Sequence, residues 1–181
     1  MSGHSKWSTI KRKKAATDAV KGRLFSRLSK MIEIAAKSGA DPKSNFALKA
    51  VVEQARAANM PMVNIERAIK KGGGGEGASN LEEVVYEAYG PGGVAILITG
   101  ITSNKNRTVS EIKHILTQNH SSLSGVGSVK WMFDFKFENG EAVWAPKQIV
   151  NLSQEDSAKL DNLLEALEEN EDVSDVFTNG N

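Results

Sequence analysis

The sequence has no cysteine, and its 181 residues include only four prolines, three histidines and two tyrosines. The absence of cysteine excludes disulfides, thiolate metal sites and cysteine nucleophiles, and it suits a reducing cytoplasm. No run of about eighteen apolar residues occurs, so no segment is expected to span a membrane. The basic first residues lack the apolar segment that follows in a secretory signal. The remainder, 40% hydrophobic and 25% charged, is typical of a soluble globular protein.

The sequence also offers little for catalysis. His114 and His120 are six residues apart, a spacing that does not place two imidazoles on one helical face, and His4 lies near the start of the chain. The Gly-x-Ser-x-Gly motif of a serine nucleophile does not occur. We therefore expect a protein that is not an enzyme and that uses no metal or cofactor.

The net charge of +1 conceals a strong separation of charge along the chain. Residues 1–77 contain 16 Lys and Arg against six Asp and Glu, a net charge of +10. Residues 78–181 contain seven Lys and Arg against 16 Asp and Glu, a net charge of −9. Such a difference between the two halves predicts a polyanionic partner for the basic half.

The stretch from Gly3 to Lys14 holds five Lys and Arg, one tryptophan and no acid. No helical or strand period of apolar residues runs through it, so it has no face to bury. A nucleic acid would neutralise its cations, and the ring of Trp7 could stack on a base. A solvated tail without a ligand is the alternative interpretation.

Three helices are predicted next, over residues 18–37, 44–58 and 62–71, and their short connections favour a small bundle. Cations on the first helix lie beside its apolar stripe and continue the charge of the preceding stretch, although a solvated face would look the same. The second and third helices resemble a helix-turn-helix, but an ordinary bundle corner has the same pattern. The predicted nucleic-acid-binding residues are Lys6, Trp7, Lys11, Arg12, Lys13, Lys14, Lys21, Arg23, Arg27 and Lys30.

Four consecutive glycines, Gly72 to Gly75, separate the two halves. A phosphate-binding loop is disfavoured, because no Gly-Lys-Ser or Gly-Lys-Thr follows and no strand precedes. We predict a flexible hinge over residues 72–80, about which a first domain (residues 1–71) and a second domain (residues 81–181) reorient.

Beyond the hinge the apolar period changes to two, which indicates strands. From residue 94 the predicted order is strand, helix, strand, strand, helix, strand, the pattern of a ferredoxin-like α/β sandwich, with residues 84–89 as an added strand. Thr108 to Glu111 has the pattern of a capping box that opens the first of these two helices. The predicted fold class is α+β, a three-helix bundle joined to an acidic ferredoxin-like domain.

The predicted strand over residues 129–137 carries an alternating aromatic row, Phe133, Phe135 and Phe137. On an open sheet such a row could stack bases, as in RNA-recognition domains. We favour a place in the core, because helices must cover one face of the sheet and because this half of the chain is acidic.

Several motifs occur in the order in which one known family has them. They are Gly3-His4-Ser5-Lys6-Trp7, Asn59-Met60-Pro61, Asn64 to Lys70, Tyr86 to Val94, Asn106 to Val109, Gly127-Ser128-Val129 and Pro146-Lys147. On these motifs the chain resembles the YebC/PmpR family, which includes the mitochondrial translational activator of cytochrome oxidase. Family members usually carry a further small α/β domain between the equivalents of Phe137 and Pro146. This chain has only residues 138–145 there, so it resembles a shortened member.

The resemblance implies a cytoplasmic, non-enzymatic regulator of gene expression. Family members are described as DNA-binding transcriptional regulators and as ribosome-associated translation factors, and both kinds bind a polyanion. One tryptophan beside five cations suits irregular RNA better than closed duplex DNA, so we favour ribosomal RNA over DNA. A protein adaptor, whose acidic half binds a basic partner such as a ribosomal protein, is a third interpretation. We expect a monomer.

Overall fold

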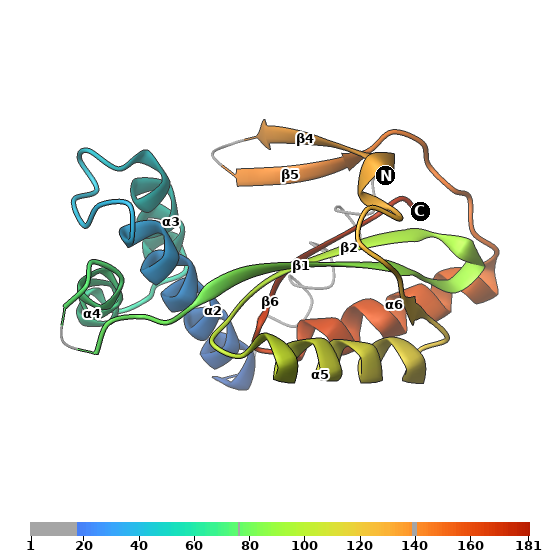
Figure 1. Ribbon diagram of the computed structural model, residues 1–181, viewed down its shortest axis with the longest axis horizontal. Coiled ribbons are helices and arrows are strands. Elements are labelled where there is room, and N and C mark those ends of the chain that lie inside the picture. Colours follow the sequence, from blue (N-terminus) through green and yellow to red (C-terminus); the bar gives the residue numbers. More distant parts are fainter. Residues whose placement is uncertain (1–17, 76, 139–140) are drawn as a thin grey trace.

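A computed structural model describes residues 18–75, 77–138 and 141–181 of the chain. It consists of a helical bundle and an α/β sandwich that lie side by side (Figure 1). The predicted α+β class is confirmed, with the three helices of the bundle preceding the sheet domain. Within the described stretches, no helix has the length and apolar character that crossing a membrane requires.

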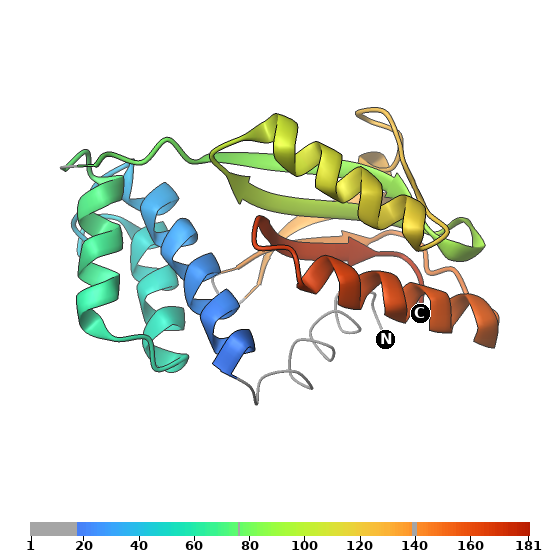
Figure 2. The same ribbon diagram turned by 90° about the horizontal axis from the view of Figure 1, so that it is seen from below.

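The bundle consists of α2 (Asp18–Ala36), α3 (Phe46–Ala57) and α4 (Met62–Gly72). The apolar stripes of these helices meet in one core, as their spacing predicts. Its buried members are Leu28, Ile32, Ala36, Leu48, Val52, Ala55, Met60, Ile65 and Ala68. Of the three helices, α2 lies nearest to the sheet domain (Figures 1 and 2).

A four-stranded antiparallel sheet forms the centre of the second part, in the order β3-β1-β2-β6. Its strands are β1 (Glu82–Tyr89), β2 (Ala95–Thr102), β3 (Ser122–Leu123) and β6 (Val173–Thr178). Two helices, α5 (Lys105–Gln118) and α6 (Gln154–Glu168), cover one face of this sheet (Figure 2). Ile96 and Ile98 of β2 are buried there in one cluster with Ile112 of α5 and Leu164 of α6.

A hairpin lies over the opposite face of the sheet (Figure 1). Its strands, β4 (Phe133–Glu138) and β5 (Glu141–Pro146), form a separate two-stranded sheet. The expectation that the aromatic strand belongs to the main sheet is therefore wrong. The short β3 takes the position next to β1 instead, and residues 130–132 form a 3-10 turn that separates β3 from β4.

The aromatic row is divided between core and solvent. Phe133 is buried in a small cluster under the hairpin, whereas Phe135 and Phe137 are 54% and 72% exposed. The prediction of a core position is thus wrong for these two side chains. One cause is the buried carboxylate of Glu87, which accepts three backbone hydrogen bonds of 2.6 to 2.8 Å from residues 127–130. These bonds fix the segment before β4 on β1, so that only the first residue of β4 reaches the core.

The start of α5 also differs from the prediction. The helix begins at Lys105, and the side chain of Asn104 caps it by accepting a hydrogen bond from the Arg107 backbone N–H at 3.1 Å. Thr108 lies inside the helix, where its hydroxyl oxygen is 2.8 Å from Thr102 Oγ1 and 2.7 Å from Asp172 Oδ2. The prediction that a capping box opens this helix at Thr108 is therefore wrong, because Asn104 caps the helix one turn earlier.

The glycine run begins inside α4. Gly72 is buried, and a Cβ at this position would lie 2.7 Å from Ala36 Cβ and 2.8 Å from Glu33 Cα of α2. The absence of a side chain at Gly72 thus permits the close approach of α4 to α2. Gly74, with φ +87°, has the left-handed conformation that other residues rarely adopt. The hinge motion itself stays a prediction.

Candidate nucleic-acid interface

Six of the ten predicted binding residues lie outside the described residues. They are Lys6, Trp7, Lys11, Arg12, Lys13 and Lys14. The other four belong to α2, and the structure places them on surfaces of different kinds.

Lys21 and Arg23 lie in the first turns of α2. Lys21 is exposed, and Arg23 is half-buried. The Nε atom of Arg23 is buried and has no hydrogen-bond partner among the described residues. Both side chains stay candidates for an anionic ligand.

Arg27 and Lys30 lie on the side of α2 that faces the α/β domain. Arg27 is 5% exposed, and its Nη1 lies 2.6 Å from Glu168 Oε1, while its Nη2 donates to the Glu168 backbone carbonyl. Lys30 Nζ lies 2.6 Å from Asp172 Oδ1 and 2.9 Å from the Glu171 carbonyl oxygen. Their assignment to a nucleic-acid surface is corrected by this arrangement, because carboxylates of the same chain neutralise both cations and attach the bundle to the sheet domain.

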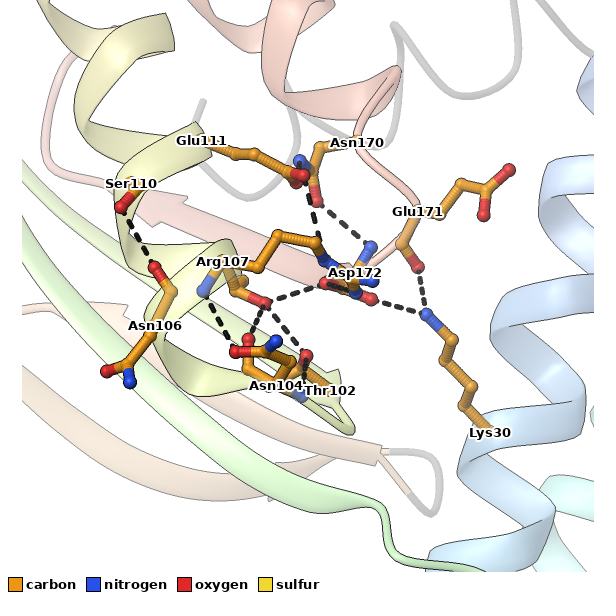
Figure 3. Close-up of polar contacts among 11 residues, drawn as sticks. Lys30, Thr102, Asn104, Asn106, Arg107, Ser110, Glu111, Asn170, Glu171 and Asp172 are labelled. Atoms are coloured by element: carbon orange, nitrogen blue, oxygen red, sulfur yellow. Dashed lines mark hydrogen bonds and ion pairs between the residues drawn. The ribbon is translucent and has the colours of Figure 1, made fainter.

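Asp172 is the centre of this attachment (Figure 3). Its side chain is 4% exposed and accepts hydrogen bonds of 2.6 to 2.7 Å from Lys30, Arg107 and Thr108. Burial alone raises the pKa of a carboxyl group, but these three donors outweigh it and lower the pKa of Asp172 to about 2. Sequence reasoning missed this residue, because its partners lie 64 to 142 positions away along the chain.

A groove of about 320 Å³ lies between α2 and α4, away from the attachment. Asn64, Arg67 and Lys71 line it from α4, where spacings of three and four residues place them on one helical face. Ser26 and Ser29 contribute from α2. The groove also contains Glu33, whose carboxylate lies 3.8 Å from Lys71 Nζ. Phe25, Met60 and Ala68 complete the lining. Among its polar members, the serine hydroxyls, Asn64 and Arg67 can donate hydrogen bonds to phosphate and sugar oxygens.

Exposed cations occur on all three helices of the bundle and on the loop between α2 and α3. The exposed Lys and Arg of the bundle whose side chains make no hydrogen bond or ion pair to another described residue are Lys21, Lys43, Arg56, Arg67 and Lys70. We call these five residues, with the groove, the open face of the bundle.

Acidic side chains do not gather into a metal site. Over the described stretches, no three or more His, Asp and Glu residues are grouped so that they could hold a metal ion. The buried acids Glu87, Glu168 and Asp172 each accept hydrogen bonds from protein donors instead.

Most of the chain matches the descriptions of a known family. Residues 5–75 match "TACO1/YebC protein N-terminal domain", and residues 81–137 and 134–180 match "TACO1/YebC second and third domain". The chain belongs to the TACO1/YebC family. The resemblance seen in the sequence motifs is therefore confirmed.

Individual TACO1/YebC relatives agree with this assignment. A "probable transcriptional regulatory protein" of Desulforamulus reducens is 40% identical over 99% of this chain and 98% of that protein. A protein of the same name from Natranaerobius thermophilus is 56% identical over 75% of this chain and 55% of that protein. The crystal structure of the conserved hypothetical protein Aq1575 from Aquifex aeolicus superimposes with a TM-score of 0.82 at 32% identity, over 91% of each chain.

The same comparisons show where this chain is shorter than its relatives. The alignment with the Desulforamulus protein extends over 238 positions, whereas this chain has 181 residues. The match to the second and third domains consists of two segments, and their interruption falls at residues 134–137, inside β4, where the two segments overlap. The relative therefore carries several tens of residues that this chain lacks, and the interruption lies where the sequence motifs indicate a missing domain.

Proposed function

We propose that this TACO1/YebC protein is a non-enzymatic regulator of gene expression that binds nucleic acid through the open face of its bundle. The observation that carries the proposal is the separation of the bundle's cations into two sets. Arg27 and Lys30 are neutralised by Glu168 and Asp172. The five exposed cations Lys21, Lys43, Arg56, Arg67 and Lys70 have no ion-pair partner among the described residues. Solvated cations attract a polyanion and release its counterions on binding. The names of the relatives support a role in gene regulation.

Ribosomal RNA is the ligand that we favour, with the protein acting as a ribosome-associated translation factor in the cytoplasm. The groove lies between two helices, and among the described residues no single helix projects from the bundle as a reader of the DNA major groove would. The outer side of α4 carries Met62 and Val63, which are 45% and 60% exposed, together with the acid Glu66. Such a side is poorly suited to reading base edges in duplex DNA. Residues 3–14, outside the described residues, hold five further Lys and Arg.

Duplex DNA is the alternative ligand, and the relatives' names favour it. The two ligands differ in what Trp7 contributes. Stacking on an unpaired RNA base contributes roughly 1–3 kcal/mol, whereas the bases of a duplex are already stacked on each other. Trp7→Ala should therefore weaken binding to looped ribosomal RNA and change binding to duplex DNA little.

The open face is tested by a double charge reversal, Arg67→Glu with Lys70→Glu. Binding of the full chain to a looped ribosomal RNA fragment and to duplex DNA is measured by fluorescence anisotropy over a series of salt concentrations. If both side chains bind phosphates, the slope of log K against log salt should fall by roughly 0.7–0.9 for each phosphate that is no longer neutralised. Sedimentation of extract through sucrose should show the same variant leaving the ribosomal fractions at lower salt.

The matched control is Lys113→Glu, which reverses an exposed charge on α5 of the acidic domain. It changes the net charge in the same direction and should leave the salt slope unaltered. An unchanged slope in the Arg67 and Lys70 variant, or an equal effect of the control, would contradict the proposal.

A further inference from the structure

Within the part of the chain that the structure describes, the outer strand of the hairpin has an uncovered edge. Among the described residues β4 pairs with β5 alone, and it is β5, not β4, that lies against β6 of the main sheet. Figure 1 shows β4 at the outer margin of the molecule. Such an edge presents unpaired backbone N–H and C=O groups to which another strand can add.

Apolar surface accompanies this edge. Phe135 and Phe137 are 54% and 72% exposed, and they lie on one face of the hairpin with Trp144. The ring centroids of Phe135 and Trp144 are 5.0 Å apart, and those of Phe135 and Phe137 are 6.0 Å apart. A two-stranded sheet with exposed aromatic residues gains stability when further strands extend it, because each ring buries more of its surface.

The sequence of β4 is complementary to itself. In Phe133-Asp134-Phe135-Lys136-Phe137, an antiparallel pairing centred on Phe135 places Asp134 opposite Lys136 of a second copy, and Lys136 opposite its Asp134. On the other face, the same pairing places Phe135 opposite Phe135 of the second copy and Phe133 opposite its Phe137. Opposite charges and aromatic pairs at directly facing positions both stabilise antiparallel strands.

Neighbouring registers lack this complementarity. Centring on Asp134 places two aspartates opposite each other, and centring on Lys136 places two lysines opposite each other. A shift by one residue pairs charged with aromatic side chains on both faces. The present partner of Asp134 is Lys147, at 3.6 Å in a half-exposed ion pair, and such a surface pair stabilises too weakly to prevent the exchange.

The position of β4 in the family gives this edge its significance. The longer relatives continue from this point into several tens of additional residues. In this chain β4 connects to β5 through residues 139–140 alone. The shortened chain thus keeps an aromatic strand at the point where the longer chains have a further segment.

We propose that β4 is a self-association surface, through which two copies of the chain pair antiparallel about a two-fold axis at Phe135. The product is a four-stranded sheet in the order β5-β4-β4-β5. An isologous contact of this kind uses the same residues on both copies and closes at a dimer. The expected monomer is replaced in this proposal by a dimer that carries two open faces.

The ion pairs are tested by charge swapping in the full chain. Sedimentation equilibrium over a range of protein concentrations should show a dimer. Lys136→Asp should raise its dissociation constant by about tenfold or more, because two acids then face each other at two places. Asp134→Lys should act in the same way. The double variant, with Asp134→Lys and Lys136→Asp together, should restore the dimer, since the swapped charges are complementary again.

The register is tested by disulfide cross-linking. Because the chain has no native cysteine, only the introduced cysteines can form disulfides. A mixture of Asp134→Cys and Lys136→Cys proteins should form mixed disulfide dimers under mild oxidation, because directly opposite Cα atoms lie about 4.5–5.5 Å apart. Each variant alone should cross-link less, since identical positions are diagonal neighbours. Lys113→Cys, on the remote α5, serves as the control. A monomer at every concentration, a dimer indifferent to Lys136→Asp, or failure of the double variant to recover would overturn the proposal.

Discussion

On the side of α2 that faces the α/β domain, Arg27 and Lys30 lie against Glu168 and Asp172. On the side that faces α4, the same helix lines a groove with Arg67 and Lys71. The cations of the first region are neutralised by carboxylates of the α/β domain, whereas Arg67, in the second, has no ion-pair partner among the described residues. Cations of one bundle thus differ in whether a carboxylate far away along the chain neutralises them.

The largest effect is expected from removing the carboxylate that neutralises Arg27. Glu168→Leu should lower the free energy of unfolding by about 3–5 kcal/mol, because it leaves a buried cation without a counter-charge. RNA affinity, which we propose to depend on the open face, should change little while the protein stays folded. Urea denaturation at neutral pH measures the first effect, and anisotropy under native conditions measures the second.

A double replacement checks the cause of that loss. Arg27 Nε and Glu168 Oε2 are buried without hydrogen-bond partners among the described residues, so the pair is incompletely satisfied. Arg27→Met combined with Glu168→Leu should therefore recover most of the stability that the single change removes. If the double variant is as unstable as the single one, packing and not charge is the origin of the effect.

The sequence predicted the elements that depend on local pattern. The three helices of the bundle follow from apolar periodicity, and α6 begins at a serine cap, Ser153, which accepts from the Asp156 N–H at 3.1 Å. It could not predict which cations of α2 would be neutralised, because Glu168 lies 141 positions from Arg27. The same limit applies to Phe135, whose alternating strand pattern is identical for a core strand and for an exposed hairpin. Periodicity specifies which residues share a face, whereas burial depends on what that face meets.

The second effect concerns acid, which should weaken the attachment of α2 to the α/β domain through Asp172. The folded pKa of Asp172, about 2, lies below its ordinary value of 3.8. Its stabilising contribution is therefore complete above the ordinary value and is lost as pH falls toward the folded value. From this shift we expect about 2–3 kcal/mol to disappear between roughly pH 5 and pH 2. Urea denaturation of the wild type and of Asp172→Asn at several pH values measures it.

The comparison with Asp172→Asn isolates this residue from the other carboxylates, which titrate in both proteins. The variant should be less stable than the wild type at neutral pH. The difference between their free energies of unfolding should decrease on acidification. If the difference in free energy of unfolding stays constant down to pH 3, the charge on Asp172 contributes nothing to the attachment of the bundle.

The smallest of the three effects concerns Gly72, on which the position of the open face depends. Gly72→Ala should destabilise the protein by about 1–3 kcal/mol, because the added methyl group meets backbone atoms of Glu33 and must push α4 away from α2. Displacement of α4 also moves Arg67 and Lys71, so RNA affinity should fall as well. Glu168→Leu, in contrast, should affect stability alone.

Gly22→Ala is the matched control for this substitution. Gly22 lies in α2 with no atom within 4 Å of an added Cβ. Alanine there should raise stability by about 0.5–1 kcal/mol, since glycine inside a helix loses more conformational entropy on folding. Thermal unfolding and anisotropy of both variants distinguish a packing role of Gly72 from a purely flexible one. If Gly72→Ala were as stable as Gly22→Ala and bound RNA normally, the glycine would be the first residue of a passive linker, and the close contact of α4 with α2 would not be what places the open face.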